Sequence, residues 1–296
     1  MIKVITHSGG FHADDVFAVA AFQLLLGKEN VEVIRTREDA VIETGDYIVD
    51  AGLQYDHEAR RYDHHQPGAP VRENGIPYAA FGLVWKHYGA EICDSDEVAT
   101  KIEEKLCVPV DASDNALNIW EPGQFDLRPL EWDDILQSWR AEPTLGEDAD
   151  EQFLKAVDVA REYLLRRIQR ETIKVSQKKA VADLYENTDE AGRAILISDT
   201  YVPRSEFVQH EEVNVVVFPR ELDVSPGWVA VAVQKNEHDY ATRVRFPESW
   251  AGLRDAELAE MSGFADAKFC HKDRYMFIAD SKESAIAAAQ LAMPAD

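Results

Sequence analysis

Histidine side chains crowd into the first 65 residues of this chain, in the company of aspartates, in a pattern suited to binding metal ions. Five of the nine histidines lie in this stretch, which is about a fifth of the sequence. Imidazole and carboxylate donors without thiolates are typical of sites for manganese, magnesium, iron or cobalt, whereas structural zinc sites usually take cysteine. The clustering therefore predicts a metal centre near the amino terminus. The histidines are His7, His12, His57, His64 and His65.

The aspartates stand in three groups beside these histidines. Asp14 and Asp15 follow His12 in "HSGGFHADD", Asp50 ends the apolar run "YIVD", and Asp63 opens "DHH". Two divalent cations repel each other, so a site that holds both needs several carboxylates to offset that repulsion. A dinuclear centre is the economical interpretation of so many acidic groups.

Each residue also has an ordinary structural explanation. A single histidine after a strand, such as His7, is more often a hydrogen-bonded polar residue than a ligand, and Asp14 or Asp15 could be a helix N-terminal charge. Asp50 is harder to explain in this way, because a carboxylate at the end of a buried strand costs free energy unless it is paired or bound to metal. For the "DHH" run as a whole, the metal interpretation is favoured.

The segment "GLQYDHEARRYDHHQ" (52–66) carries the tripeptide Tyr-Asp-His twice. If "LQYD" and "RRYD" pair as a short hairpin, the first copy leads into the second. Asp56 of the first copy could then hold a metal ligand in place through a hydrogen bond. We expect the second copy, with Asp63 and His64, to carry the chemistry.

Alternating strand and helix patterns in the first third of the chain predict a parallel βαβ sheet. Polar groups would then gather at the carboxyl ends of strands, which is where open parallel sheets bind ligands. Acidic residues begin the first helix and Gly27 ends it, as is typical of helix boundaries. The predicted strands lie in 2–9, 31–36 and 46–52, and the predicted helices are 14–27, 78–89 and 95–106.

One long helix and a smaller sheet are predicted for the second half of the chain. Apolar residues at positions 153, 157, 160, 164 and 168 recur in steps of four and three, which indicates an amphipathic helix. Closely spaced strand-like runs then predict an antiparallel sheet, followed by a loop, a short strand and a closing helix near Ser281. The runs are 193–199, 213–219, 228–234 and 241–247.

A chain of 296 residues favours two domains. With the long helix as their boundary, we expect an α/β protein with a parallel-sheet amino-terminal domain in 1–148 that binds metal. A connecting helix would occupy 149–182, and a smaller α+β domain would occupy 183–296.

The formal charge of -24 limits the class of ligand that the surface attracts. An acidic surface repels long nucleic acids, so any attraction for a phosphate must come from metal ions or from a few local basic side chains. The three cysteines are far apart in the sequence, which argues against a disulfide framework. With no run of eighteen apolar residues and no secretory signal pattern, we expect a soluble, cytoplasmic protein that does not associate with membranes.

The segment "RYDHHQ" (61–66) resembles the signature of the DHH phosphoesterase superfamily. Together with "HSGGFHADDVFA", "VDAGLQYD", "VDASDN" and "SGFADAKFCH", it resembles one branch, the melanocyte proliferating gene family of metal-dependent hydrolases and exonucleases. These motifs occur in the right order along nearly the whole chain, which makes the resemblance specific. It implies that the first domain is a DHH-type catalytic domain and that the second covers the substrate.

The resemblance also implies roles for individual residues. His7, His12 and Asp14 stand where the first metal-binding motif of the superfamily lies. Asp50 corresponds to a carboxylate that bridges two ions, and His64 to a ligand of the second ion. The superfamily usually has aspartate where His12 stands, with one residue fewer before it, so the metal preference of this chain could differ.

Further residues are implied around the phosphate. His65 corresponds to a group that touches the phosphate and could protonate the leaving oxygen, beside Asp63. In "VDASDN" the last metal ligand is Asp111 or Asp114, and Asp111 is favoured because it ends an apolar run.

Basic residues of the second domain are candidates for contacting the substrate. The segment "FCHKDR" offers His271, Lys272 and Arg274, and "ATRVRF" offers Arg243 and Arg245, whose alternation places both on one face of a strand. Paired arginines on a strand are also common as a hydrated edge. The glycine-rich GGGH segment of many superfamily nucleases is absent, and "FCH" could stand in for it.

The sequence and the resemblance together predict a metal-dependent phosphoester hydrolase. We expect a 3′ to 5′ exonuclease or oligonucleotide phosphodiesterase that uses two Mn²⁺ ions, with Mg²⁺ or Co²⁺ as alternatives, to activate a water. Its substrate would be single-stranded RNA or DNA. A phosphatase for pyrophosphate or a small nucleotide, and a metal-binding regulator without enzymatic activity, are the other hypotheses. A homo-oligomer is compatible with all three.

Overall fold

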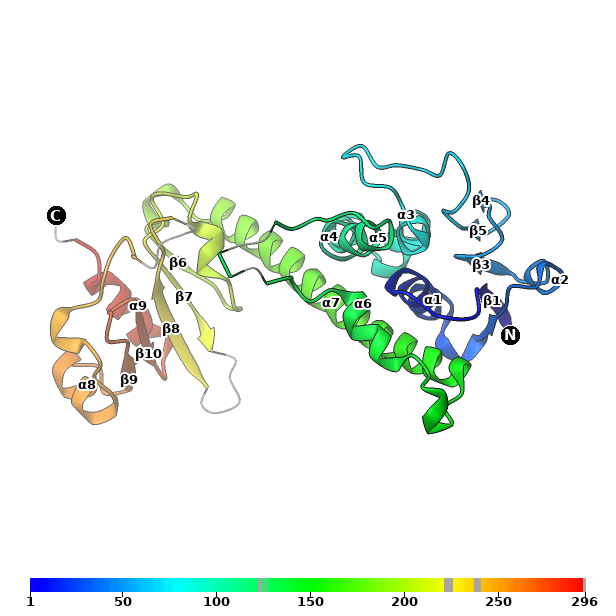
Figure 1. The fold of residues 1–296 in the computed structure, drawn as a ribbon. Helices are drawn as coiled ribbons and strands as arrows, with labels where there is room; N and C mark the ends of the chain where they lie inside the picture. The colour runs from blue at the N-terminus through cyan, green and yellow to red at the C-terminus, as the bar shows by residue number, and fades with distance from the viewer. Residues whose placement is uncertain (122–123, 126, 221–225, 237–240, 295–296) are drawn as a thin grey trace. The chain divides into compact units, whose positions relative to one another are not determined.

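The structure is a computed structural model that describes residues 1–121, 124–125, 127–220, 226–236 and 241–294. The fold is mixed α/β, with two five-stranded sheets and surrounding helices (Figure 1). The chain divides into two compact units, Met1–Ile173 and Lys174–Asp296. Each unit contains one of the sheets, and the division falls inside the long helix α7 (Ala149–Glu186).

The sheet of the first unit is almost entirely parallel. Its strand order is β2-β1-β3-β5-β4, and only the pairing of β4 with β5 is antiparallel. β-branched and aromatic residues dominate these short strands, as the pleated, half-buried surface of a sheet favours. The strands are β1 (Ile2–Thr6), β2 (Val31–Arg35), β3 (Tyr47–Val49), β4 (Tyr55–Asp56) and β5 (Arg61–Tyr62).

The carboxyl ends of the four parallel strands form one edge of this sheet. His7 follows β1, Asp50 follows β3 and Asp63 follows β5. Because parallel strands end on the same side, residues that are far apart in the sequence become neighbours there. The parallel topology therefore assembles the polar groups that the sequence analysis singled out.

Helices cover the sheet of the first unit on one face. α1 and α3 pack against each other there, while the one-turn α2 lies on the opposite face beside a small cluster of Ile5, Ile42 and Ile48 (Figure 1). The helices are α1 (Ala13–Leu26), α2 (Asp39–Ile42), α3 (Ala80–Cys93), α4 (Asp96–Ile102), a π-helical turn (Glu103–Cys107), α5 (Val108–Asp114) and α6 (Trp132–Leu136).

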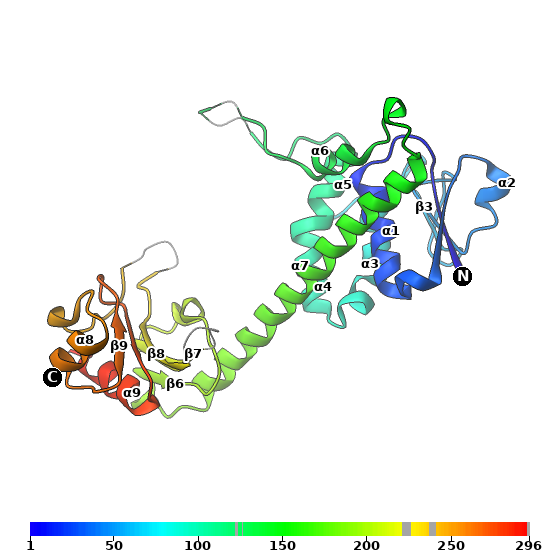
Figure 2. The ribbon, with the colours of Figure 1, turned by 90° about the horizontal axis from the view of Figure 1, so that it is seen from below.

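Aromatic contacts fix α1 in the centre of the first unit. Phe17 stacks on Phe81 of α3 with a centroid distance of 5.2 Å, and it meets Trp132 of α6 edge to face at 5.0 Å. Tyr163, on the first half of α7, also faces Phe17, and this half of the helix runs beside α1 (Figure 2). Since Asp14 and Asp15 lie in the first turn of α1, this packing also positions those carboxylates.

The sheet of the second unit has the strand order β6-β7-β8-β10-β9. β6 and β7 are parallel, and the other neighbours are antiparallel. Alanines of α9 pack on one face, and Val181 of α7 packs with Phe207 on the other. The elements are β6 (Ile195–Ile197), β7 (Val215–Arg220), β8 (Gly227–Ala232), α8 (Asp255–Ser262), β9 (Ala267–Cys270), β10 (Met276–Ala279) and α9 (Lys282–Leu291).

Most of the predicted elements are confirmed, and one strand is wrong. Residues 241–247 form no strand, since Thr242 makes only an isolated bridge to Gln234. The sheet is instead completed by β9 and β10, and its parallel β6–β7 pair departs from the predicted antiparallel pattern. Within the described residues, none of the helices combines the length and the apolar character needed to cross a bilayer.

Replacing Phe17 with alanine should destabilise the first unit strongly. Phe17 has no exposed surface, and removing a buried phenylalanine side chain costs about 3–5 kcal/mol. Urea unfolding followed by tryptophan fluorescence measures the change, with Leu154→Ala on α7 as the control, because Leu154 is 41% exposed. Equal midpoints for the two variants would contradict the central position of Phe17.

Candidate metal centre

Three sets of potential metal ligands meet at the carboxyl edge of the first sheet. In each set, one ligand atom per residue lies within 4.8 Å of the others. Each set combines imidazole and carboxylate groups, which suit divalent cations of the first transition row. The sets are Asp50 with His64 and His65, His7 with Asp15 and Asp50, and His12 with Asp14 and Asp114.

Asp50 belongs to two of these sets and lies between two histidines. Its Oδ2 is 3.2 Å from Nε2 of His7, and its Oδ1 is 3.5 Å from Nε2 of His64. Burial raises the pKa of Asp50, but the two imidazoles outweigh this effect and hold the pKa well below its usual range. Through its two oxygens, this one carboxylate links the two ligand sets.

The backbone of Asp50 is strained. Its φ is +48°, in the left-handed region, which costs a residue with a side chain about 1–2 kcal/mol. Its backbone N–H donates to the carbonyl of Tyr62 at 3.0 Å, so β5 holds the unusual conformation in place. Strain of this kind persists where the surrounding structure fixes the backbone, and it often marks a functional position.

His64 lies among three carboxylates. Its Nε2 is 3.0 Å from Oδ2 of Asp114, and 3.9 Å from Oδ2 of Asp14, in addition to the contact with Asp50. Burial lowers the pKa of His64, but Asp114 and Asp50 outweigh this effect and raise it to about 10. Without a bound cation, this ring is therefore protonated at neutral pH and offsets part of the negative charge of the cluster.

Asp14 and Asp15 are fully buried at the start of α1. Burial and the neighbouring carboxylates raise the pKa of Asp14 well above its usual value. Burial raises the pKa of Asp15 to about 7, although His7 acts in the opposite direction. Oδ1 of Asp14 and Oδ2 of Asp15 accept no hydrogen bond from any described residue, and a buried oxygen in that state needs a proton or a cation.

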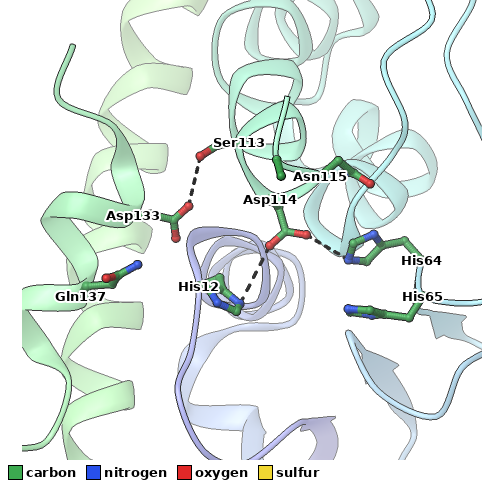
Figure 3. A pocket seen from close by; sticks show the side chains of 9 residues that line it. His12, His64, His65, Ser113, Asp114, Asn115, Asp133 and Gln137 are labelled. Atoms are coloured by element: carbon green, nitrogen blue, oxygen red, sulfur yellow. Dashed lines mark hydrogen bonds and ion pairs between the residues drawn. The ribbon is translucent and has the colours of Figure 1, made fainter. Parts of the chain in front are cut away.

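The third set opens onto a cavity of about 530 Å³ that His12, His64, His65 and Asp114 line in part. Asp114, at the end of α5, extends between His12 and His64, as the dashed lines in Figure 3 show. The His12 side chain is 48% exposed and its Nδ1 is 4.0 Å from Asp114. This set is therefore accessible to a substrate through His12.

Asp63 supports the cluster instead of facing its centre. Its Oδ2 accepts a hydrogen bond from the backbone of Leu53 at 2.7 Å, and its Oδ1 accepts one from the backbone of His65 at 2.9 Å. The same Oδ1 is 2.8 Å from Nδ1 of His65. Asp63 thus fixes the loop after β3 and orients the His65 ring, whose side chain is 55% exposed.

The residues of the first Tyr-Asp-His copy make contacts that stabilise the fold. The predicted hairpin is confirmed, with Tyr55 opposite Tyr62. Asp56 accepts a hydrogen bond from the backbone of Ala59 at 3.1 Å, and it is not part of the three ligand sets. His57 stacks on His87 at a centroid distance of 3.7 Å.

Asp111, the ligand favoured from the sequence, lies outside the three sets, and Asp114 lies inside one of them. The two residues are three positions apart on α5, but they meet different partners, since Asp111 pairs with Arg72 and Asp114 with His64. Asp111 is fully buried, and its Oδ2 accepts a hydrogen bond from Arg72 at 2.6 Å. Burial raises its pKa to about 7 although Arg72 acts in the opposite direction. The structure thus places Asp114, the other residue that the sequence offered, among the possible metal ligands and leaves Asp111 outside them.

Arg72 ties the loop after the DHH run to the helix that carries Asp114. Besides Asp111, its guanidinium contacts Glu103 at 2.7 Å and the carbonyl of Pro77 at 3.2 Å. The space for this ion pair exists because residue 82 is glycine. A Cβ at Gly82 would lie 1.8 Å from Oδ2 of Asp111 and 2.4 Å from Nη2 of Arg72.

The basic candidates from the sequence all lie in the second unit. Arg243 is committed to the protein itself, since its guanidinium donates to the carbonyls of His210 and Val213 at 2.5 and 2.6 Å. Since 241–247 is no strand, the prediction that Arg243 and Arg245 share a strand face is wrong.

The other basic candidates differ in exposure. Arg245 and Lys272 are exposed, whereas His271 and Arg274 are partly buried. Nδ1 of His271 accepts from the backbone of Asp273, and Arg274 has a φ of +60°.

Two residues of the cluster were not predicted as ligands. Asp15 was explained as a helix N-terminal charge, and Asp114 came second to Asp111. The spacing "HADD" places successive carboxylates on different sides of a helix start, so either could face the sheet edge. The polar residues around Asp114 in "DASDN" give no sign that its side chain is buried. Its contact with His64 depends on long-range packing, which the local sequence does not reveal.

Replacing Gly82 with alanine should destabilise the first unit by about 1–3 kcal/mol or more, because overpacking forces the buried Arg72–Asp111 pair apart. Thermal unfolding measures the effect. Glu91→Ala, at an exposed position on the same helix α3, is the matched control and should change stability by at most about 0.5 kcal/mol. An unchanged midpoint for Gly82→Ala would show that the pair has room to move.

Comparisons with known proteins place this chain among its relatives. The family model for MYG1 exonucleases, described as "Uncharacterised protein family (UPF0160)", matches residues 3–293. The MYG1 protein of Dictyostelium discoideum is 29% identical over 96% of this chain and 94% of its own length. The MYG1 exonuclease of Mus musculus is 27% identical over 96% of this chain and 83% of its own length.

A solved structure, that of a pGpG-specific phosphodiesterase from Vibrio cholerae, aligns over 98% of both chains, with 12% identity and a TM-score of 0.33. At that level the similarity carries no argument about fold or function. The family match, by contrast, covers the chain from its first strand to its last helix. The chain belongs to the MYG1 exonuclease family.

Proposed function

We propose that this protein is a metal-dependent phosphoester hydrolase that acts as a 3′ to 5′ exonuclease or oligonucleotide phosphodiesterase. The observation that carries the proposal is the position of Asp50, whose two carboxylate oxygens face His7 and His64 at 3.2 and 3.5 Å. The exonuclease name of its mammalian relatives supports the same reaction class. The proposal also includes membership of the DHH superfamily, which the sequence motifs resemble.

The donor set fits two divalent cations. His7 and Asp15 would hold one ion and His64 and Asp114 the other, with Asp50 between them and Asp14 and His12 completing the sites. The buried oxygens of Asp14 and Asp15 without hydrogen bonds support this fit, because a cation would satisfy them. Mn²⁺ is the expected ion, with Mg²⁺ or Co²⁺ as alternatives, since the donors are imidazole and carboxylate.

Divalent ions held there would supply a nucleophilic water and neutralise charge on the phosphate. The chain itself would orient the groups around that reaction. Asp63 faces Nδ1 of His65 at 2.8 Å, so it selects the ring orientation that leaves Nε2 available. His65 would hold a proton there and deliver it to the leaving oxygen. Its exposed side chain allows the ring to reach a substrate.

The functional division of the chain remains a proposal as well. Residues 1–148 would form a DHH-like catalytic domain, 149–182 a connecting helix, and 183–296 a domain that contributes substrate contacts through His271, Arg245, Lys272 and Arg274. Arg243 is no longer a candidate, because backbone carbonyls occupy its guanidinium.

A second candidate function is a phosphatase for pyrophosphate or a small nucleotide. The formal charge of -24 favours it, because a small substrate needs no extended basic groove. Mn²⁺-dependent release of mononucleotides from labelled single-stranded RNA or DNA would support the exonuclease. Release of phosphate from pyrophosphate alone would support the phosphatase. If none of these substrates is hydrolysed with any of the metals, the remaining hypothesis is a metal-binding regulator without enzymatic activity.

Replacing His64 with alanine should reduce the rate of metal-dependent hydrolysis by about 100-fold or more. The substitution removes a proposed metal ligand whose Nε2 lies near three carboxylates. Single-stranded RNA cleavage with Mn²⁺ measures the effect. His57→Ala is the matched control, since it alters the same position of the first Tyr-Asp-His copy and should retain activity within a few-fold. Both variants need circular dichroism to establish folding. Equal activities for the two folded variants would contradict the assignment of the second copy.

Metal binding should release protons and strengthen as the pH rises. In the metal-free protein His64 has a pKa of about 10 and Asp15 of about 7, so both hold protons at or below neutral pH. A metal ligand must lose its proton, and therefore the affinity for Mn²⁺ should increase between pH 6 and 9, by about tenfold for each proton released per pH unit.

Isothermal titration of Mn²⁺ in two buffers of different ionisation enthalpy measures the number of protons released. His64→Ala should release fewer protons than the wild-type protein at the same pH. An affinity for Mn²⁺ that is independent of pH, or proton uptake on binding, would show that these groups are not the ligands.

A further inference from the structure

A second cavity lies beside the candidate metal centre. It has a volume of about 670 Å³, and residues of the metal centre line it, including His7, Asp50 and His65. It shares His12 and His65 with the 530 Å³ cavity on the side of Asp114. A substrate bound at the cluster therefore has space on two sides, as a chain that continues beyond its cleaved bond would need.

Arg37 lines this second cavity. It follows β2, so it stands at the same carboxyl edge of the sheet as His7 and Asp50. Its Nε donates to the carbonyl of Ser8 at 3.0 Å, and its Nη2 lies 3.1 Å from Nδ1 of His7. The opposite nitrogen of that ring, Nε2, is the one that faces Asp15 and Asp50. One imidazole ring thus separates the guanidinium from the cluster.

The guanidinium of Arg37 keeps part of its hydrogen-bonding capacity. Arginine has five N–H donors in a planar fork that matches the oxygens of a phosphate. Among the described residues, none accepts a hydrogen bond from Nη1 of Arg37. The bond to Ser8 fixes the position of the fork, and fixing it in advance reduces the entropy that a ligand contact would cost.

The charge of the surroundings makes Arg37 distinctive. Among the described residues that line the two cavities, it is the only arginine or lysine. Asp39 and Glu43 line the same cavity as Arg37, and the whole chain carries a formal charge of -24. Where the general field repels polyanions, one fixed cation supplies the local attraction on which phosphate binding depends.

We propose that Arg37 binds a non-scissile phosphate of an oligonucleotide, the one next to the bond that is cleaved. The His7 ring lies between Arg37 and the carboxylates, so the cleaved phosphate would sit at the cluster and its neighbour in the cavity of Arg37. The site therefore prefers substrates with at least two phosphodiesters. This inference rests on the proposed function and specifies its substrate class. Asp39 and Glu43 add like-charge repulsion against further phosphates, which favours short chains.

The test compares two RNA substrates, the dinucleotide ApA, whose one phosphate is the scissile one, and the trinucleotide ApApA, which adds a second phosphate. Wild-type protein with Mn²⁺ should cleave ApApA with a kcat/KM about 10- to 100-fold higher, as expected for one charge-assisted hydrogen-bonded contact. Arg37→Ala should lose most of this preference, because its KM for ApApA should rise by a larger factor than its KM for ApA. Arg37→Lys should recover part of it, because the charge remains without the fork.

Two controls separate this role from a structural one. Lys28→Ala removes one positive charge from an exposed pair with Asp158 outside both cavities, and it should retain the preference. Mn²⁺ affinity of Arg37→Ala should equal that of the wild-type protein, since no ligand is removed.

Three results would overturn the inference. The first is that Arg37→Ala lowers kcat/KM equally on ApA and ApApA, and the second is that this variant keeps the wild-type preference for ApApA. The third is a weakened Mn²⁺ affinity of the variant, which would show that Arg37 acts by holding His7. If the wild-type protein cleaves neither RNA while hydrolysing pyrophosphate, the exonuclease proposal itself fails, and this inference fails with it. That outcome differs from all three, because they require an active wild-type protein.

Discussion

Repulsion between buried carboxylates is the constraint on which the rest of the structure depends. Asp50 faces both His7 and His64, Asp15 faces His7, and Asp14 lies near His64. Asp114 joins them from another helix. Like charges this close cannot all remain ionised in a poorly solvated place without compensation. The raised pKa values of Asp14 and Asp15, together with that of His64, show protons supplying this compensation. Divalent cations could replace those protons.

The fold keeps these groups together against their repulsion. Parallel strands set the positions of His7, Asp50 and Asp63, while the aromatic packing around Phe17 sets the first turn of α1. The Arg72–Asp111 pair links the loop after the DHH run to α5. Three independent layers of contacts therefore converge on one edge.

Local patterns predicted the elements that carry the site, and long-range packing decided the details. The βαβ pattern and the strand-end positions of His7 and Asp50 were sufficient to place both at one edge. The choice between Asp111 and Asp114 was not accessible in this way, because it depends on which side of α5 meets Arg72. The run 241–247 alternates like a strand, yet the backbone carbonyls that Arg243 contacts hold it in another conformation.

The left-handed backbone of Asp50 has a consequence for variants of this protein. Glycine adopts a φ of +48° at little cost, so Asp50→Gly would relieve this strain but remove the carboxylate that faces His7 and His64. Asp50 therefore holds a carboxylate between two imidazoles at the cost of backbone strain, as functional positions often do. Under the proposed function, Asp50→Gly would be suited to trapping an uncleaved oligonucleotide in a crystal.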